Sequence, residues 1–174
     1  MNCRAHGGDG IWREMEKAMT GGYSQIEAAV DSYVDPEAFQ VLPDLPPSPL
    51  LVSGQCVDLV SYNDGIVKST TGYDLIRTLP SFLNLQSHIK CGSKVNRTVD
   101  MATDVGSVVF INADPVALAR DISIVRHLED NNFMFEFYSA EEAEWLQKRE
   151  FVTKACALDI QHRTAVQSLI CDNN

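Results

Sequence analysis

A proline-rich stretch divides this chain of 174 residues. The segment LPDLPPSPL, residues 42–50, holds four prolines in nine residues. Proline fixes φ and removes a backbone donor, so neither a helix interior nor a central strand can run through this segment. We therefore expect an extended connector, with separate sets of elements before and after it.

The residues before the connector carry signals for helices. Asp9 is placed to cap the segment GIWREMEKAM, which ends at a pair of glycines, and Ser24 with Glu27 three residues later has the spacing of a capping box. Asp35 followed by proline predicts the start of a short helical turn.

Beyond the connector the apolar spacing becomes that of strands. Asn63-Asp64-Gly65 lies between two apolar runs and predicts a hairpin turn. A short helix or turn is expected in the segment GYDLIRTLPSF, ended by Pro80. Further strands are expected at LNLQSHI (83–89), RTVDMAT (97–103) and GSVVFINA (106–113), the last two joined as neighbours.

One helix is predicted among these strands. Asp114 is its cap, a proline takes the first position, and Leu118, Ile122 and Val125 share one face at i, i+4 and i+7. The segment NFMFEFYS (132–139) then has the pattern of a returning strand. We expect the helix to pack on a sheet that includes both 106–113 and FMFEF (133–137).

These patterns together predict an α+β fold, in which N-terminal helices precede a mostly antiparallel sheet with one packed helix. We expect four regions: residues 1–41, the connector 42–50, an α+β subdomain over 51–138, and a helical tail over 139–174 that begins with a capping box of Ser139 and Glu142. 

Composition excludes several classes of partner. The formal net charge of −10 and the pI of about 4.7 oppose binding to nucleic acid or an anionic membrane, because such binding needs clustered lysine and arginine. Apolar runs are far shorter than the roughly 20 residues that span a bilayer. The five cysteines form no C-x-x-C pair and no leader-like segment opens the chain, so we expect reduced thiols in a cytoplasmic protein.

The opening stretch NCRAHGGDG, residues 2–10, resembles the end of the catalytic core of ATP-grasp enzymes. Amino-acid (carboxylate-amine) ligases of this family end their last catalytic strand with E-x-N-x-R, followed shortly by Gly-Gly. Asn2, Arg4, Gly7 and Gly8 match this pattern, whereas the glutamate would stand immediately before Met1. The order of hairpin, strands and capped helix after residue 50 is also similar to the C-terminal subdomain of these ligases.

The resemblance implies the C-terminal portion of an ATP-grasp fold, with residues 1–41 as the end of the catalytic core. It also implies a ligase that activates a carboxylate as an acyl phosphate, with ATP and Mg²⁺ as cofactors of the full-length parent. Asn2 would be a metal ligand and Arg4 a catalytic residue, since alternate strand residues face one side and a guanidinium holds phosphoryl oxygens bidentately. Gly7 and Gly8 would bind substrate by letting the backbone approach it.

No segment of the chain resembles the glycine-rich phosphate loop, the nucleotide-binding lysines or the acidic metal ligand of these ligases. The resemblance therefore implies a fragment that is inactive alone and binds no cofactor tightly. Its partners would be the missing ATP-grasp subdomains and an amino-acid or small carboxylate substrate, not nucleic acid or membrane. A non-catalytic small-molecule or protein-binding module derived from the subdomain is the alternative, and a truncated product without function is a third interpretation.

Four further residues near the opening stretch have two interpretations each. His6 and Asp9 are either metal ligands or a loop histidine beside a helix cap. Trp12 and Tyr23 are either core aromatics or contacts to substrate, since this region borders the substrate pocket in the ligases that the chain resembles.

Overall fold

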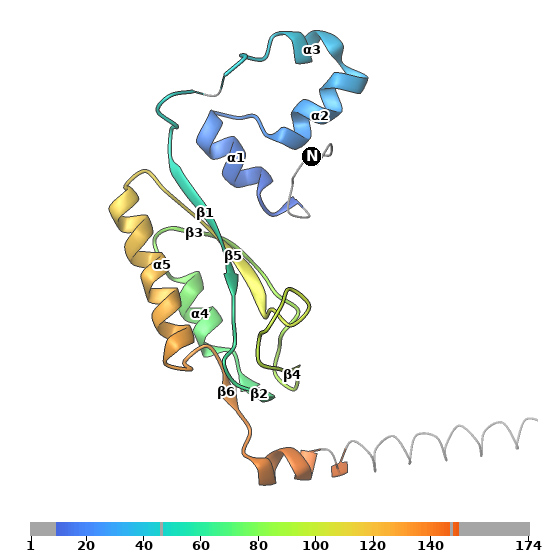
Figure 1. Ribbon diagram of the computed structural model, residues 1–174, viewed down its shortest axis with the longest axis vertical. Coiled ribbons are helices and arrows are strands. Elements are labelled where there is room, and N and C mark those ends of the chain that lie inside the picture. Colours follow the sequence, from blue (N-terminus) through green and yellow to red (C-terminus); the bar gives the residue numbers. More distant parts are fainter. Residues whose placement is uncertain (1–9, 46, 147, 150–174) are drawn as a thin grey trace, which may run out of the picture. The chain divides into compact units, whose positions relative to one another are not determined.

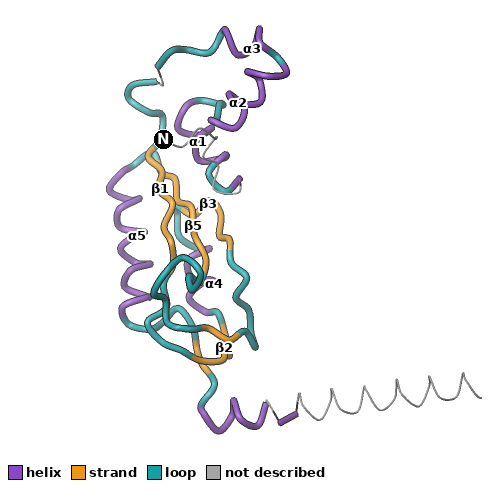
Figure 2. Tube along the Cα trace, turned by 45° about the vertical axis from the view of Figure 1, so that its right-hand side comes forward, coloured by secondary structure: helices purple, strands orange, loops and turns teal. Residues whose placement is uncertain are grey.

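The computed structural model describes residues 10–45, 47–146 and 148–149 (Figures 1 and 2). The chain forms two compact units, Met1–Glu136 and Phe137–Asn174. Within the second unit, residues 140–146 and 148–149 are helical. The predicted capping box is confirmed there, because Ser139 N donates to Glu142 Oε2 at 2.8 Å and Glu142 N donates to Ser139 Oγ at 3.2 Å. In the described part of the chain, no helix is long and apolar enough to cross a membrane.

Three helices open the first unit: α1 (Arg13–Thr20), α2 (Gln25–Val34) and α3 (Pro36–Gln40). The predicted stop of the first helix is confirmed, since Gly21 has φ of 92° and bonds back to the carbonyl of Lys17. Ser24 and Glu27 form the predicted capping box of α2, and the Asp35 side chain caps α3. The expected cap Asp9 lies outside the described residues.

The strands form two sheets of three. The larger sheet has the order β1-β5-β3, from β1 (Ser53–Leu59), β5 (Gly106–Asn112) and β3 (Phe82–Gln86), and both pairings are antiparallel. The smaller has the order β4-β2-β6, from β4 (Lys94–Val95), β2 (Gly65–Ser69) and β6 (Glu136–Phe137). The predicted mixture of helices and antiparallel sheet is therefore confirmed.

Helix α5 (Pro115–Asp130) packs against β1 and β5, and Figure 1 shows it running beside the larger sheet. The predicted cap is present, because Asp114 accepts a hydrogen bond from Val116 N at 2.8 Å. Leu118 and Val125 are buried and Ile122 is half-buried, as the helical spacing predicts. The expectation of a single packed helix is wrong, because α1 also contacts β1 and β5, and α4 (Thr71–Arg77) contacts β3.

Two buried carboxylates of α5 attach it to the chain around the sheet. Asp121 accepts a hydrogen bond from Ser81 N at 2.9 Å, just before β3, and Glu129 accepts one from Val60 N at 3.0 Å, just after β1. Both backbone donors lie at strand ends, where the sheet itself supplies no partner. The helix therefore supplies acceptors for backbone groups that the sheet leaves unpaired.

The predicted hairpin at Asn63-Asp64-Gly65 is wrong in its pairing. Strands do flank the turn, but β1 pairs with β5 and β2 pairs with β4. The turn is attached to another segment instead: Ser61 N donates to Thr98 Oγ1 at 3.0 Å, and Asp64 accepts from Arg97 N at 2.5 Å. These long-range bonds separate the two strands that a local hairpin would have joined.

Two other expected strands are mostly absent. Residues 97–103 form a turn, because the Asp100 and Thr103 side chains bond backbone groups that a strand would need. In 132–139 only β6 is a strand, and it belongs to the smaller sheet. The apolar run crosses α4 instead, where Gly72 N donates to Met134 O at 3.1 Å and the Phe135 ring meets Tyr73 edge-on at 5.1 Å. 

Candidate functional site

Different helices pack on the two faces of the larger sheet. Side chains alternate along a strand, so Gly54, Cys56 and Asp58 of β1 share one face while Val57 and Leu59 share the other. A Cβ on Gly54 would lie 2.6 Å from Met15 Cγ, which places α1 on the first face. Figures 1 and 2 show α1 and α5 on opposite sides of the strands. Helix α1 covers only one end of its face, and the rest of that face is open.

This open face carries a groove with a volume of about 380 Å³. Polar residues directly opposite one another on three strands form its floor: Asp58 on β1 pairs with Ser107 on β5, and Ser107 pairs with Gln86 on β3. Cys56 lies on the same face, one pleat further along β1. A continuous polar row therefore crosses the sheet at the base of the groove.

The walls of the groove come from two other parts of the chain. Ile11 and Trp12, just before α1, form one wall, and His88, Met101 and Asp104 from the segment between β3 and β5 form another. Together with the floor and Ser87 and Gly106, these residues define the open-face groove. The groove thus combines apolar, aromatic and acidic side chains in one cavity.

Hydrogen bonds fix the segment that forms the second wall. The Val105 carbonyl accepts from Tyr73 Oη at 2.5 Å and from Ser87 Oγ at 2.7 Å. Gly106 has φ of 133°, and a Cβ there would lie 2.5 Å from Gln86 O, so only glycine lets the two strands approach this closely. Burial raises the pKa of Tyr73 to about 12, and its hydroxyl therefore stays protonated as a donor at neutral pH.

Cys56 is a half-buried thiol at the base of the groove. Burial raises its pKa, and hydrogen bonds from the Trp12 and Ser107 side chains offset only part of that rise. A raised pKa keeps the thiol protonated and a poor nucleophile at neutral pH. The bond to Trp12 instead joins the wall of the groove to its floor.

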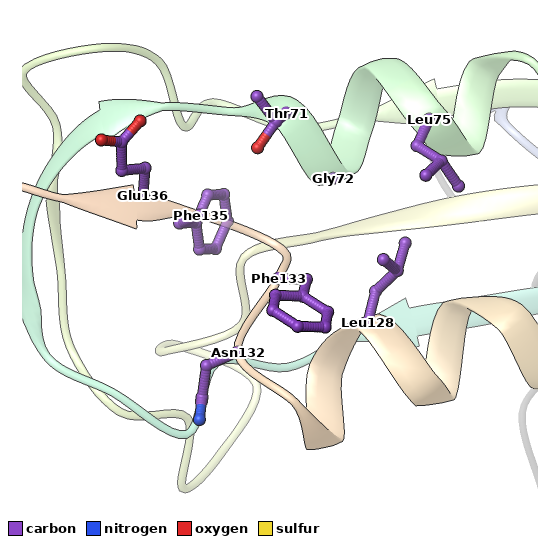
Figure 3. Close-up of a pocket in the computed structure, with 8 residues that line it drawn as sticks. All are labelled: Thr71, Gly72, Leu75, Leu128, Asn132, Phe133, Phe135 and Glu136. Atoms are coloured by element: carbon purple, nitrogen blue, oxygen red, sulfur yellow. The ribbon is translucent and has the colours of Figure 1, made fainter.

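A second pocket, of about 430 Å³, lies between α4, the end of α5 and residues 132–136 (Figure 3). Leu75 projects into it from α4 and Leu128 from α5, and the rings of Phe133 and Phe135 complete a mainly apolar lining. It offers few groups that could take part in a reaction. The open-face groove is the stronger candidate site.

The residues that the sequence assigned to catalysis, substrate and metal (Asn2, Arg4, Gly7 and Gly8) lie outside the described residues, as do His6 and Asp9. Of the two aromatics with open roles, Trp12 lines the groove, whereas Tyr23 donates to Asp31 Oδ2 at 3.1 Å and does not line it. Within the described ranges, no group of three or more His, Cys, Asp or Glu could hold a metal ion.

Sequence reasoning missed most of the groove. Asp104, for example, follows the turn that Asp100 and Thr103 form, and it also lines the cavity. The polar residues at alternate positions of β1, β3 and β5 were a usable signal. Their pattern is that of an ordinary solvent-facing strand surface, however, and only the strand order brings Asp58, Ser107 and Gln86 together.

No protein-family model matches the chain, and no curated protein matches it either. Among solved structures, the fold is similar to that of an L-amino acid ligase from Bacillus licheniformis, with a TM-score of 0.55 and 12% sequence identity. The match covers 76% of this chain and 31% of the ligase chain. At this identity the similarity concerns the fold, so the chain has a fold like that of about a third of an amino-acid ligase.

Proposed function

We propose that this chain is the C-terminal part of an ATP-dependent carboxylate-amine ligase and forms one side of its substrate site. The observation that carries the proposal is the fold similarity to an L-amino acid ligase over 76% of the chain. The opening stretch supports it independently, because Asn2, Arg4, Gly7 and Gly8 match the end of an ATP-grasp core. The nucleotide-binding parts would lie in residues that this sequence does not include.

The proposed reaction has two steps. A carboxylate oxygen of the acid substrate attacks the γ-phosphorus of ATP, the bond to the bridging oxygen breaks, and ADP leaves. The nitrogen of the amine substrate then attacks the acyl carbon, loses a proton to a base, and expels phosphate that keeps the former carboxylate oxygen. Arg4 would bind the transferring phosphoryl oxygens, where negative charge accumulates.

The cofactor assignment depends on residues outside the described ones. The described residues offer no cluster of three metal-binding side chains, and Asn2 alone supplies one neutral oxygen, whereas Mg²⁺ prefers carboxylates together with substrate phosphates. In this proposal the remaining ligands and the ATP site belong to the larger enzyme. We therefore expect neither Mg²⁺ nor ATP to bind the isolated chain tightly.

Chain connectivity limits the distance between the proposed substrate-binding residue Gly8 and the open-face groove. Gly8 precedes Ile11 by three residues, and three residues span at most about 11 Å. Ile11 lines the groove. In this proposal the groove borders the reaction centre and holds part of a substrate.

The test is release of phosphate from ATP in the presence of Mg²⁺ and mixed amino acids. We expect no turnover by the 174-residue chain, and turnover by a longer protein translated from the reading frame upstream of Met1. In the longer protein, Arg4→Ala should lower turnover by about 10²- to 10³-fold. The control Arg77→Ala, which removes an exposed α4 ion pair with Asp74, should leave it unchanged.

Turnover by the 174-residue chain would contradict the fragment interpretation, and an unimpaired Arg4→Ala enzyme would contradict the role of Arg4. If a stop codon interrupts the reading frame upstream of Met1, or the longer protein releases no phosphate, the proposed ligase function is wrong. The non-catalytic binding module then becomes the better interpretation.

A further inference from the structure

We infer that the open-face groove binds a primary ammonium group on a small, partly apolar molecule. The inference that this molecule is a substrate rests on the proposed function, in which it is the amine that is joined to the activated carboxylate. The binding itself does not depend on catalysis. It follows from the charge, rigidity and apolar surface of the groove.

Among the described residues, the charge that lines the groove is negative. Asp58 and Asp104 both line it, and among the described residues no lysine or arginine does. Neither carboxylate has a hydrogen-bond donor or a cation as partner within the described residues. Elsewhere in the first unit acidic side chains do find cations, as in the pairs Arg13–Glu27 and Arg77–Asp74.

Both carboxylates stand on fixed backbone. Asp58 pairs with Ser107 in the sheet, and its carbonyl accepts a hydrogen bond from Arg126 at 3.1 Å. Asp104 adjoins Val105, whose carbonyl takes two hydrogen bonds from Tyr73 and Ser87. Little ordering would therefore be needed when a cation binds, which favours affinity.

Apolar surface lies beside these acids. The side chains of Ile11, Trp12 and Met101 line the same cavity. The Trp12 ring is held there by its hydrogen bond to Cys56. The face of an aromatic ring attracts a cation. Contact with the ring also removes the apolar surface of an alkyl group from water, which favours binding. The volume of about 380 Å³ is near the lower end for ligand pockets, which suits a molecule of amino-acid size.

A metal ion fits the groove less well than an ammonium group. A divalent ion needs about six oxygen ligands, and the described residues contain no cluster of even three acidic, histidine or cysteine side chains. An ammonium group has three donors and is satisfied by two carboxylates and one neutral acceptor. Ser107 and Gln86, which lie in the same polar row as Asp58, supply neutral acceptors.

The experiment is an NMR titration of the 174-residue chain with three probes of one side chain: L-leucinamide, L-leucine and N-acetyl-L-leucine. We expect saturable shifts for leucinamide at the Trp12 indole N–H and at the amides of Asp58, Gln86 and Ser107. Leucine, with its added carboxylate, should bind more weakly. N-acetyl-leucine, which lacks the ammonium group, should produce no saturable shift.

Asparagine variants test whether the charge of the two carboxylates, and not only the shape of the groove, contributes to binding. Asp58→Asn combined with Asp104→Asn should weaken leucinamide binding about tenfold, because two ion pairs at a partly exposed site are lost. The matched control Asp74→Asn removes an exposed acid of α4 and should not change it. Unchanged far-UV circular dichroism would establish that the double variant is folded.

Equal binding of N-acetyl-leucine and leucinamide, or unchanged affinity in the folded double variant, would overturn the inference. The titration uses no ATP, so its outcome is distinct from that of the phosphate-release assay. A groove that binds leucinamide in a protein without ligase activity would contradict the proposed function alone. An active ligase whose groove ignores leucinamide would contradict this inference alone.

Discussion

The buried side chain of Asp121 in α5 is expected to contribute strongly to the stability of the fold. Its side chain is fully buried, and it accepts a hydrogen bond from Ser81 N at 2.9 Å and two from the Arg120 guanidinium at 3.0 and 3.1 Å. Ser81 is itself buried, so its N–H has no access to water. Asp121 therefore attaches α5 to the start of β3.

The cost of changing Asp121 follows from these contacts. Asp121→Ala leaves the Ser81 N–H buried without an acceptor, which costs about 1–3 kcal/mol of unfolding free energy. Loss of the Arg120 pair adds at most about 1 kcal/mol, because that arginine side chain is 59% exposed. Asp121→Asn keeps an oxygen for Ser81 and loses only the charge, so we expect a smaller cost of about 1 kcal/mol.

The pH dependence gives a second, independent measure of the same contact. Burial raises the pKa of Asp121, but the bonds from Ser81 and Arg120 outweigh it, and the pKa lies below its ordinary value. The unfolded chain then binds a proton more readily than the folded one as the pH falls below about 4. The stabilisation is complete above that pH and is lost as the pH falls through the folded pKa.

Urea unfolding followed by circular dichroism, at pH 7 and at steps down to pH 3, measures both effects. We expect Asp121→Ala to be less stable than Asp121→Asn, and both to lose less stability than the parent chain on acidification. Asp130→Asn is the control, since this exposed acid ends the same helix, and it should change stability by less than about 0.5 kcal/mol. An effect of Asp121→Ala no larger than that of Asp130→Asn would refute the contact.

Three further predictions concern packing and the groove. Val125→Ala should lower the unfolding free energy by about 2–3 kcal/mol in the same assay. Val116, on the same helix, is 74% exposed, and Val116→Ala should lower it by less than about 0.5 kcal/mol. Similar losses in the two variants would mean that α5 buries a different face. Gly72→Ala should cost about 1–3 kcal/mol, because its Cβ would lie 2.5 Å from Met134 Cα, and a variant as stable as the parent would contradict that crossing. Iodoacetamide should label Cys56, with its raised pKa, more slowly than the exposed Cys91 when followed by mass spectrometry, and faster labelling of Cys56 would contradict its half-buried position.

The sequence predicted best the elements that are defined by local interactions. The capping boxes at Ser24 and Ser139 and the helix that begins after Asp114 depend on residues three or four positions apart, and all three were found as predicted. The positions of β1, β2, β3 and β5 were predicted for the same reason, whereas the strand expected over 97–103 is absent. Strand partners were wrong, because the pairing of β1 with β5 joins residues about fifty positions apart and leaves no local pattern.

The candidate site was harder to predict for the same physical reason. The sequence left Trp12 with two roles, a core aromatic or a contact to substrate, and the row of Asp58, Ser107 and Gln86 exists only after three strands have paired. Each of these residues, taken alone, is an ordinary polar position on a strand. Asn2 and Arg4 were proposed as metal ligand and catalytic residue from the resemblance to ATP-grasp ligases, and their roles stay a prediction because they lie outside the described residues.

The most direct test of the proposed ligase follows one oxygen atom. The longer protein would be incubated with ATP, Mg²⁺, an amine and an acid substrate labelled with ¹⁸O in its carboxylate, and the released phosphate analysed by mass spectrometry. Formation of an acyl phosphate transfers one labelled oxygen to each phosphate released, and we expect that label in step with product. Phosphate released without label would show that no carboxylate attacks ATP, and would contradict the account.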